Sequence, residues 1–215
     1  MLAALDVVKD FTTSAGTRRV LDGISFSISK GEKLAVLGRN GSGKTTLIQI
    51  LAGVERLTSG YIHRGLKLSW PLGFSGGFEG ELTGYDNIRF ICKIYGADLE
   101  YVVDYVADFS ELGNLLHTPV KTYSSGMRAR LAFALSIAID FECYLIDEVV
   151  LVGDKRFKER CEEALFEKKS NKAMLLAIHS MEFVKNYCSG ALVLKDGRGR
   201  VFYDTDLACK IYASL

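Results

Sequence analysis

The stretch that decides the fold is Gly38-Arg39-Asn40-Gly41-Ser42-Gly43-Lys44-Thr45. It matches the pattern GxxxxGK[ST], in which glycines let successive backbone N–H groups point into one concavity. An apolar run at 34–37 precedes it, and apolar residues at helical spacing follow it over 47–51, up to Gly53. A buried strand, a glycine loop and a helix in this order are the context that a phosphate-binding loop requires. The sequence therefore predicts that nucleotide phosphates bind at the N-terminus of the helix.

Two side chains of this loop have expected roles of their own. Lys44 is expected to reach the β and γ phosphates and to take part in catalysis, and the Thr45 hydroxyl to hold Mg²⁺. The alternative is a glycine turn that merely caps a helix. The expected ATP contacts of the loop are Gly38, Arg39, Asn40, Gly41, Ser42, Gly43, Lys44, Thr45 and Thr46.

A second apolar strand ends in two carboxylates, in the sequence Leu145-Ile146-Asp147-Glu148. A metal ion and an attacking water need different partners, so the two acids are given different roles. Asp147 is expected to hold Mg²⁺ through its hydration shell, and Glu148 to orient and polarise the water as the catalytic base. The alternative is that two acids simply end a strand.

Composition excludes several classes of protein. The 215 residues, 48% hydrophobic and 25% charged, are enough to bury a core without metals or disulfides. The net charge of +1 argues against binding to nucleic acid through bulk charge. Five cysteines without CxxC spacing indicate neither a disulfide framework nor a zinc site, and favour a reducing cytoplasm.

The chain shows no signal for export or for a membrane span. Its first 13 residues lack the basic and apolar regions of a signal peptide. Its most apolar stretch, 131–141, is shorter than the roughly 18 residues that a spanning helix needs. Any association with a membrane is therefore expected to go through a partner.

The remaining pattern predicts an α/β domain. Residues 24–29 alternate at period two, as in a strand, and 82–112 has helical spacing with Thr83 and Asp98 as N-caps. Further elements are expected from the patterns at 126–139 (helix), 143–146 (strand), 158–167 (helix), 173–178 (strand) and around Asp196-Gly197 (strand, turn, strand). Strands that alternate with helices favour a mainly parallel sheet covered on both faces.

A third motif, Tyr123-Ser124-Ser125-Gly126-Met127, opens the predicted helix at 126–139. Taken alone it is a capped helix. Its place shortly before Asp147-Glu148 resembles the signature loop of ABC-type ATPases, here YSSGM in place of the usual LSGGQ. The resemblance implies that Ser124, Ser125, Gly126 and Met127 contact the γ-phosphate of an ATP held on an opposing copy of the chain. It therefore implies a dimer with ATP between the two copies.

The same resemblance assigns roles to three further residues. His179, after the apolar strand 174–178, takes the place of the family's switch histidine and would contact the γ-phosphate. Asp154 falls in the D-loop at the dimer seam. Phe11 stands where these proteins stack an aromatic ring on adenine, although a phenylalanine of the core is the rival interpretation.

One departure from the family pattern concerns glutamine. ABC ATPases usually carry a glutamine between the P-loop and the helical lobe, where it touches Mg²⁺ and couples to the transporter. The single glutamine of this chain, Gln49, lies in the helix after the P-loop. Residues 70–84 cover the Q-loop position instead, with Ser75 and Glu79 as the nearest polar substitutes, and the choice between them is open.

The region around the Q-loop position resembles one group of ABC ATPases, the ATP-binding subunits of capsular polysaccharide exporters of Gram-negative bacteria. The segments that carry this resemblance are 69–76, 82–98, 109–113, 123–127 and 145–154. The resemblance implies an ABC-type nucleotide-binding domain over 1–215. A RecA-like core with an N-terminal antiparallel β subdomain would span 1–70 and 136–215, and a helical subdomain 71–135.

The resemblance also implies a function and partners. The chain would hydrolyse ATP with Mg²⁺ at the cytoplasmic face of the inner membrane, to drive export of a lipid-linked capsular polysaccharide. Its partners would be a second copy and an integral membrane subunit, with periplasmic and outer-membrane components engaged indirectly and no nucleic acid. The alternatives are a soluble ABC-type ATPase and an ATP-dependent regulatory module without a transport role.

Overall fold

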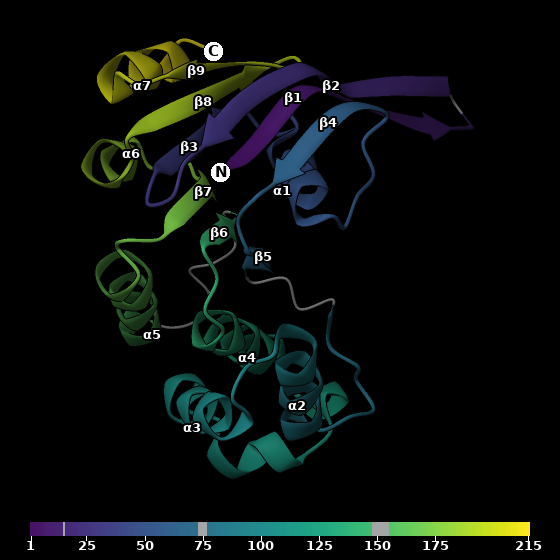
Figure 1. The fold of residues 1–215 in the computed structure, drawn as a ribbon, viewed down its shortest axis with the longest axis vertical. Helices are drawn as coiled ribbons and strands as arrows, with labels where there is room; N and C mark the ends of the chain where they lie inside the picture. The colour runs from purple at the N-terminus through teal and green to yellow at the C-terminus, as the bar shows by residue number, and fades with distance from the viewer. Residues whose placement is uncertain (15, 73–76, 148–154) are drawn as a thin grey trace. The chain divides into compact units, whose positions relative to one another are not determined.

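The computed structural model describes residues 1–14, 16–72, 77–147 and 155–215, and they form two units (Figure 1). The first unit consists of the described residues within 1–71, 141–148 and 171–215. The second unit consists of the described residues within 72–140 and 149–170. The resemblance implies that 136–140 and 155–170 belong to the RecA-like core, whereas in the structure these residues belong to the second unit.

The first unit is built on a six-stranded sheet of order β5-β6-β7-β3-β8-β9. Its four inner strands are parallel, and β9 pairs antiparallel with β8 at one edge. The predicted strands at 34–37, 143–146 and 173–178 are confirmed, and their apolar residues are buried on both faces, as in a covered parallel sheet. The strands are β3 (Lys33–Gly38), β5 (Leu68–Leu72), β6 (Cys143–Ile146), β7 (Ala173–Ala177), β8 (Gly190–Lys195) and β9 (Arg198–Phe202).

The β8–β9 hairpin turns at Asp196-Gly197, as predicted. Both residues have positive φ, 50° and 77°, which is the conformation of a two-residue turn that matches strand twist. The Gly197 carbonyl accepts a hydrogen bond from the Asp22 N–H at 2.8 Å. The turn is thereby joined to the antiparallel sheet of the same unit.

A three-stranded antiparallel sheet of order β2-β1-β4 completes the strands of the first unit, which confirms the N-terminal β subdomain. Its strands are β1 (Leu2–Thr13), β2 (Gly16–Ile28) and β4 (Ser59–Arg64). In β2, Ile24, Phe26 and Ile28 are buried while the serines between them are exposed. This period of two gives the sheet one apolar face.

Helices cover both faces of the six-stranded sheet. On one face, α1 (Lys44–Ala52) and the antiparallel sheet pack against β3, β6, β7 and β8 in the larger core cluster. On the other face, α6 (Met181–Tyr187) and α7 (Thr205–Ala213) pack against β3 and β8. Figure 1 shows α7 beside β8 and β9.

The second unit is helical, and its helices begin where the predicted caps stand. The Thr83 hydroxyl accepts the Asp86 N–H at 3.0 Å, and the Asp98 carboxylate accepts the Tyr101 N–H at 2.9 Å. The unit contains α2 (Gly84–Tyr95), α3 (Leu99–Ser110), α4 (Ser125–Ala138), α5 (Lys155–Glu162), two short 3₁₀ turns (Gly113–His117 and Val120–Thr122) and a π-helical turn (Glu163–Lys168).

The helix α5 begins before the predicted start at 158 and passes into the π-helical turn after Glu162. Its first residues, Lys155 and Arg156, are exposed and carry no apolar periodicity, so the sequence pattern does not mark them as helical. Its buried residues Phe157 and Cys161 face the interior of the second unit.

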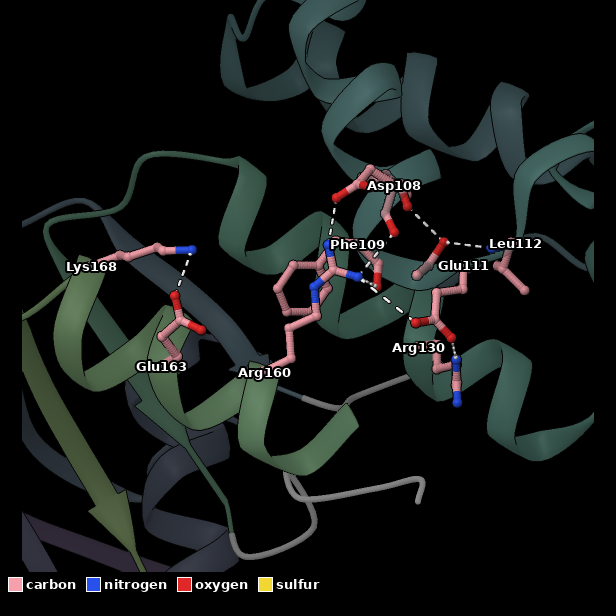
Figure 2. A network of polar contacts seen from close by, with 10 residues as sticks. Asp108, Phe109, Glu111, Leu112, Arg130, Arg160, Glu163 and Lys168 are labelled. Carbon is pink, nitrogen blue, oxygen red and sulfur yellow. Dashed lines mark hydrogen bonds and ion pairs between the residues drawn. The ribbon is translucent and has the colours of Figure 1, made fainter. Parts of the chain in front are cut away.

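Aromatic rings and a charged network join α5 to α3 and α4. The rings of Phe109, Phe133 and Phe157 contact one another with centroids 5.7–6.3 Å apart. Figure 2 shows Arg160 of α5 reaching Asp108 and Glu111. Its guanidinium lies 3.2 Å from the Asp108 carbonyl oxygen and 3.9 Å from the Glu111 carboxylate. Because Arg130 of α4 binds the other oxygen of Glu111 at 2.6 Å, one carboxylate links two helices.

Candidate nucleotide-binding site

The predicted site residues of the first unit gather at one edge of the parallel sheet. Strand β7 lies between β6 and β3 and is parallel to both, so the carboxyl ends of all three strands are neighbours. The glycine loop follows β3, Asp147 follows β6, and His179 follows β7 by one intervening residue. In open α/β sheets, this carboxyl edge is where ligands bind.

Backbone geometry explains the glycines of the loop. A Cβ on Gly38 would lie 2.8 Å from the Leu194 carbonyl oxygen, so a side chain does not fit there. Gly43 has φ +102°, and a Cβ on it would lie 2.7 Å from Leu21. A residue with a side chain at either position would disturb the loop, so the glycines of the pattern are structural requirements.

The loop holds polar groups that suit a phosphate. Lys44 is 8% exposed, and its ammonium donates to the carbonyl oxygens of Gly38 at 2.7 Å and Arg39 at 3.3 Å. The buried Ser42 Oγ has no hydrogen-bond partner in the described part of the chain. Gly43, the N-cap residue of α1, provides no side-chain hydrogen bond to the start of the helix, so the first N–H groups of α1 suit an anion.

A cavity of about 340 Å³ brings the loop and Asp147 together. Thr45 and Asp147 both line it, so the two predicted Mg²⁺ ligands face one space. Hydroxyl and carboxylate oxygens suit Mg²⁺, which usually takes its other ligands from water and substrate phosphates. Among the described residues, no cluster of three or more acidic, histidine or cysteine side chains could hold a metal ion. The lining is Arg18, Val20, Asn40, Gly41, Gly43, Lys44, Thr45, Thr46 and Asp147.

A second cavity, of about 470 Å³, borders the loop. Arg39 and Ser42 line this cavity, and Arg39 also donates to the Leu215 carbonyl oxygen at 3.1 Å. Arg18 of β2 lines both cavities, and sequence reasoning did not select it. The lining is Arg18, Arg39, Asn40, Gly41, Ser42, Leu194, Lys195, Asp196 and Leu215.

Comparison with known proteins identifies the family. The family model described as "ABC transporter" matches residues 21–150, which hold the glycine loop, the signature motif and Asp147-Glu148. This chain belongs to the ABC transporter family.

Two relatives match over nearly the whole chain. The capsule polysaccharide export ATP-binding protein CtrD of Neisseria meningitidis is 53% identical, over 100% of both chains. The ATP-binding protein BexA of Haemophilus influenzae is 51% identical, over 99% of this chain and 98% of BexA. A solved dimeric ATP-binding cassette, MJ0796 bound to ADP and Pi, has a TM-score of 0.77 over 94% of this chain and 98% of its own, at 19% identity. The structural similarity to MJ0796 shows that this chain has the fold of an ABC cassette.

The signature motif of this ABC chain opens α4 in the second unit. The Ser124 hydroxyl accepts the Met127 N–H at 3.2 Å and so caps the helix. The side chains of Ser124 and Ser125 are exposed, and a Cβ on Gly126 would meet nothing closer than 3.9 Å. The motif therefore presents small residues and a helix N-terminus to its surroundings, as the predicted phosphate contact requires.

The structure does not bring Phe11 into either cavity. Its ring on β1 is 37% exposed, outside the core, and pairs in register with Arg18. The Lys9 ammonium lies 4.5 Å from the ring centroid. Lys9 also donates to Glu55 at 2.7 Å, and this hydrogen bond lowers the pKa of Glu55. Stacking of Phe11 on adenine stays a prediction.

His179 makes a contact that sequence reasoning missed. Its Nδ1 lies 2.6 Å from the Tyr212 hydroxyl, which α7 supplies from the C-terminal part of the first unit. The two residues stand 33 positions apart, so no local pattern relates them.

Three predicted residues, Glu148, Asp154 and Ser75, lie outside the described part of the chain. Glu79, the other candidate for the missing glutamine, donates its N–H to the Asn87 amide oxygen at 2.9 Å. Within the described residues, no helix combines the length and apolar character needed to cross a bilayer.

Proposed function

We propose that this chain is the ATP-hydrolysing subunit of an ABC exporter that moves a lipid-linked capsular polysaccharide across the inner membrane from its cytoplasmic face. The observation that carries the proposal is the cavity shared by the glycine loop, Thr45 and Asp147. Identity of 53% over the full length of CtrD, a capsule polysaccharide export ATP-binding protein, supports the capsular cargo.

The loop would bind the triphosphate with groups that already face inward. The Lys44 ammonium would exchange its two carbonyl partners for phosphate oxygens, and Ser42 Oγ would gain the partner it lacks. The first N–H groups of α1 and the positive end of its helix dipole would also stabilise the bound phosphates. Phe11, whose side chain is 37% exposed, would stack on the adenine.

Thr45 and Asp147 would hold Mg²⁺ in the same cavity, Asp147 through water. The ion neutralises charge on the phosphates when it is bound. Glu148 would orient the attacking water and accept its proton, while His179 would donate a hydrogen bond to the γ-phosphate. Lys44 would stabilise the charge that develops on the transferred phosphoryl group.

A second copy of the chain would complete the site. Ser124, Ser125, Gly126 and Met127 of that copy would contact the γ-phosphate, and Asp154 would lie at the seam. The exposed serines at the start of α4 support this arrangement, and the MJ0796 cassette of the same fold is dimeric. The integral membrane subunit would receive the movement of the helical unit and pass the polymer on toward the periplasmic and outer-membrane components.

The test uses Glu148→Gln in the full chain, with purified protein in ATP and Mg²⁺. The variant should bind ATP as wild type does, hydrolyse it at least about 100-fold more slowly, and elute as a stable dimer. The same variant in ADP should be monomeric, which serves as the control. A variant that turns over ATP at the wild-type rate would remove Glu148 as the base.

A further inference from the structure

Tyr212 is a polar residue of the first unit that the proposed mechanism leaves unused. Its hydroxyl lies 2.6 Å from His179 Nδ1, a hydrogen-bond distance, and the two rings are tilted by 36° with centroids 6.2 Å apart. The contact joins the residue that follows β7 to the last helix of the chain.

The surrounding core fixes Tyr212 in place. Its ring packs against the buried cluster that α6 and α7 form on the sheet, together with Ile178. Ala208 and Cys209, one turn earlier on α7, are buried in the same cluster. The hydroxyl is thus carried by a helix that the core anchors, and its position does not depend on a loop.

The direction of this hydrogen bond depends on the tautomer of His179, since a phenol and a neutral imidazole can each donate or accept. In one of the two arrangements, the Tyr212 hydroxyl donates to Nδ1. An imidazole that accepts at Nδ1 carries its own proton on Nε2. The Nε2–H is then a donor that points away from Tyr212.

We propose that Tyr212 is a positioning residue, which fixes the tautomer and orientation of His179 so that Nε2–H is presented to the γ-phosphate. The proposal rests on the proposed function for the role of His179, and adds α7 to the parts that the reaction needs. Since α7 also packs on β8 and β9, a movement of this helix would change the orientation of His179 and with it the rate of hydrolysis.

The first test reads the tautomer directly. The chain has three histidines, so ¹⁵N spectra of the imidazoles can be assigned with a His179→Gln variant. At pH 8.5, where free imidazole is neutral, His179 should show one tautomer, protonated at Nε2. Tyr212→Phe keeps the ring and removes the hydroxyl, and it should give a mixture of the two tautomers. Tyr203→Phe, whose residue is 69% exposed, is the matched control and should leave the wild-type spectrum.

The second test is kinetic. Tyr212→Phe should lower kcat for ATP by about 10-fold, as loss of an orienting partner typically does, with KM and melting temperature at the wild-type values. An unchanged tautomer in Tyr212→Phe, or an unchanged kcat, would overturn the proposal. If the tautomer changes as expected while the wild-type chain hydrolyses no ATP, the contact stands as a positioning contact and the proposed function fails.

Discussion

At the scale of single residues, the site is defined by polar groups that the protein itself does not fully satisfy. A buried hydroxyl without a partner costs roughly 1–3 kcal/mol, and Ser42 Oγ is such a group in the described part of the chain. The buried Lys44 ammonium binds two backbone carbonyls that a phosphate oxygen can replace. Both features are expected of a loop that is completed by its ligand.

Arg18 provides a prediction at this scale, because it lines both cavities beside the loop. Arg18→Ala should raise the Kd for ATP by about 10-fold, since one hydrogen bond to a charged group contributes roughly 1.5–3 kcal/mol. The measurement is titration with a fluorescent ATP analogue, repeated with adenosine, whose binding should change little.

Arg19 is the matched control for Arg18. It is the next residue on β2 but pairs with Asp10 at 2.9 Å and Asp22 at 3.0 Å. These contacts lower the pKa of both carboxyls, with Arg198 the larger cause at Asp22. Arg19→Ala should leave the Kd for ATP unchanged. Equal effects of the two substitutions would show that Arg18 does not contact the phosphates.

At the scale of elements, the packing of α5 holds the helical unit together. Phe157 is 3% exposed and contacts Phe109 and Phe133, while the Arg130 guanidinium lies 4.6 Å from its ring centroid. Phe157→Ala should lower the free energy of unfolding by about 3–5 kcal/mol, because it opens a cavity in this cluster.

Denaturant unfolding followed by circular dichroism measures this change. Phe90→Ala is the control. Because Phe90 on α2 is 57% exposed, this substitution should change the free energy of unfolding only slightly. If Phe157→Ala lowers the free energy of unfolding no more than Phe90→Ala does, the packing described for α5 is contradicted.

Local chemistry explains which elements could be predicted from sequence. Thr83 and Asp98 mark helix starts, and Asp196-Gly197 marks a hairpin, because each acts within a few residues of itself. Asp147 could be selected because it directly follows an apolar strand, and His179 because of the resemblance to ABC ATPases, whereas their position at one edge of the sheet comes from the structure. The Tyr212 contact and the Arg18 position could not be predicted, since each depends on segments that meet only in the folded chain.

At the scale of the whole molecule, four of the five cysteines are buried, and Cys188 is partly buried against the core. Burial raises the pKa of the Cys143, Cys161 and Cys188 thiols to about 12, from an ordinary value of 9.0. Protonated thiols are thus favoured in the folded chain. Their contribution to stability is fully present below pH 9 and is lost as the pH rises from 9 toward 12.

Alkylation with iodoacetamide tests this state of the thiols. In the native chain, these three cysteines should react much more slowly than in denaturant at pH 8.5, because the thiolate is the reactive form. Mass spectrometry of the peptides measures each site separately. Rapid alkylation of Cys143 in the native chain would contradict its burial and its raised pKa.

ATP hydrolysis at this site is proposed to drive polymer export. The most direct measurement replaces Lys44 by alanine in the bacterium that encodes the chain, at matched protein levels, and quantifies polysaccharide inside the cell and at its surface. Lys158→Ala, on an exposed position of α5, is the control and should leave export unchanged. In Lys44→Ala, polymer should accumulate inside the cell and the surface should be bare. Normal surface polymer in that strain would contradict the proposal.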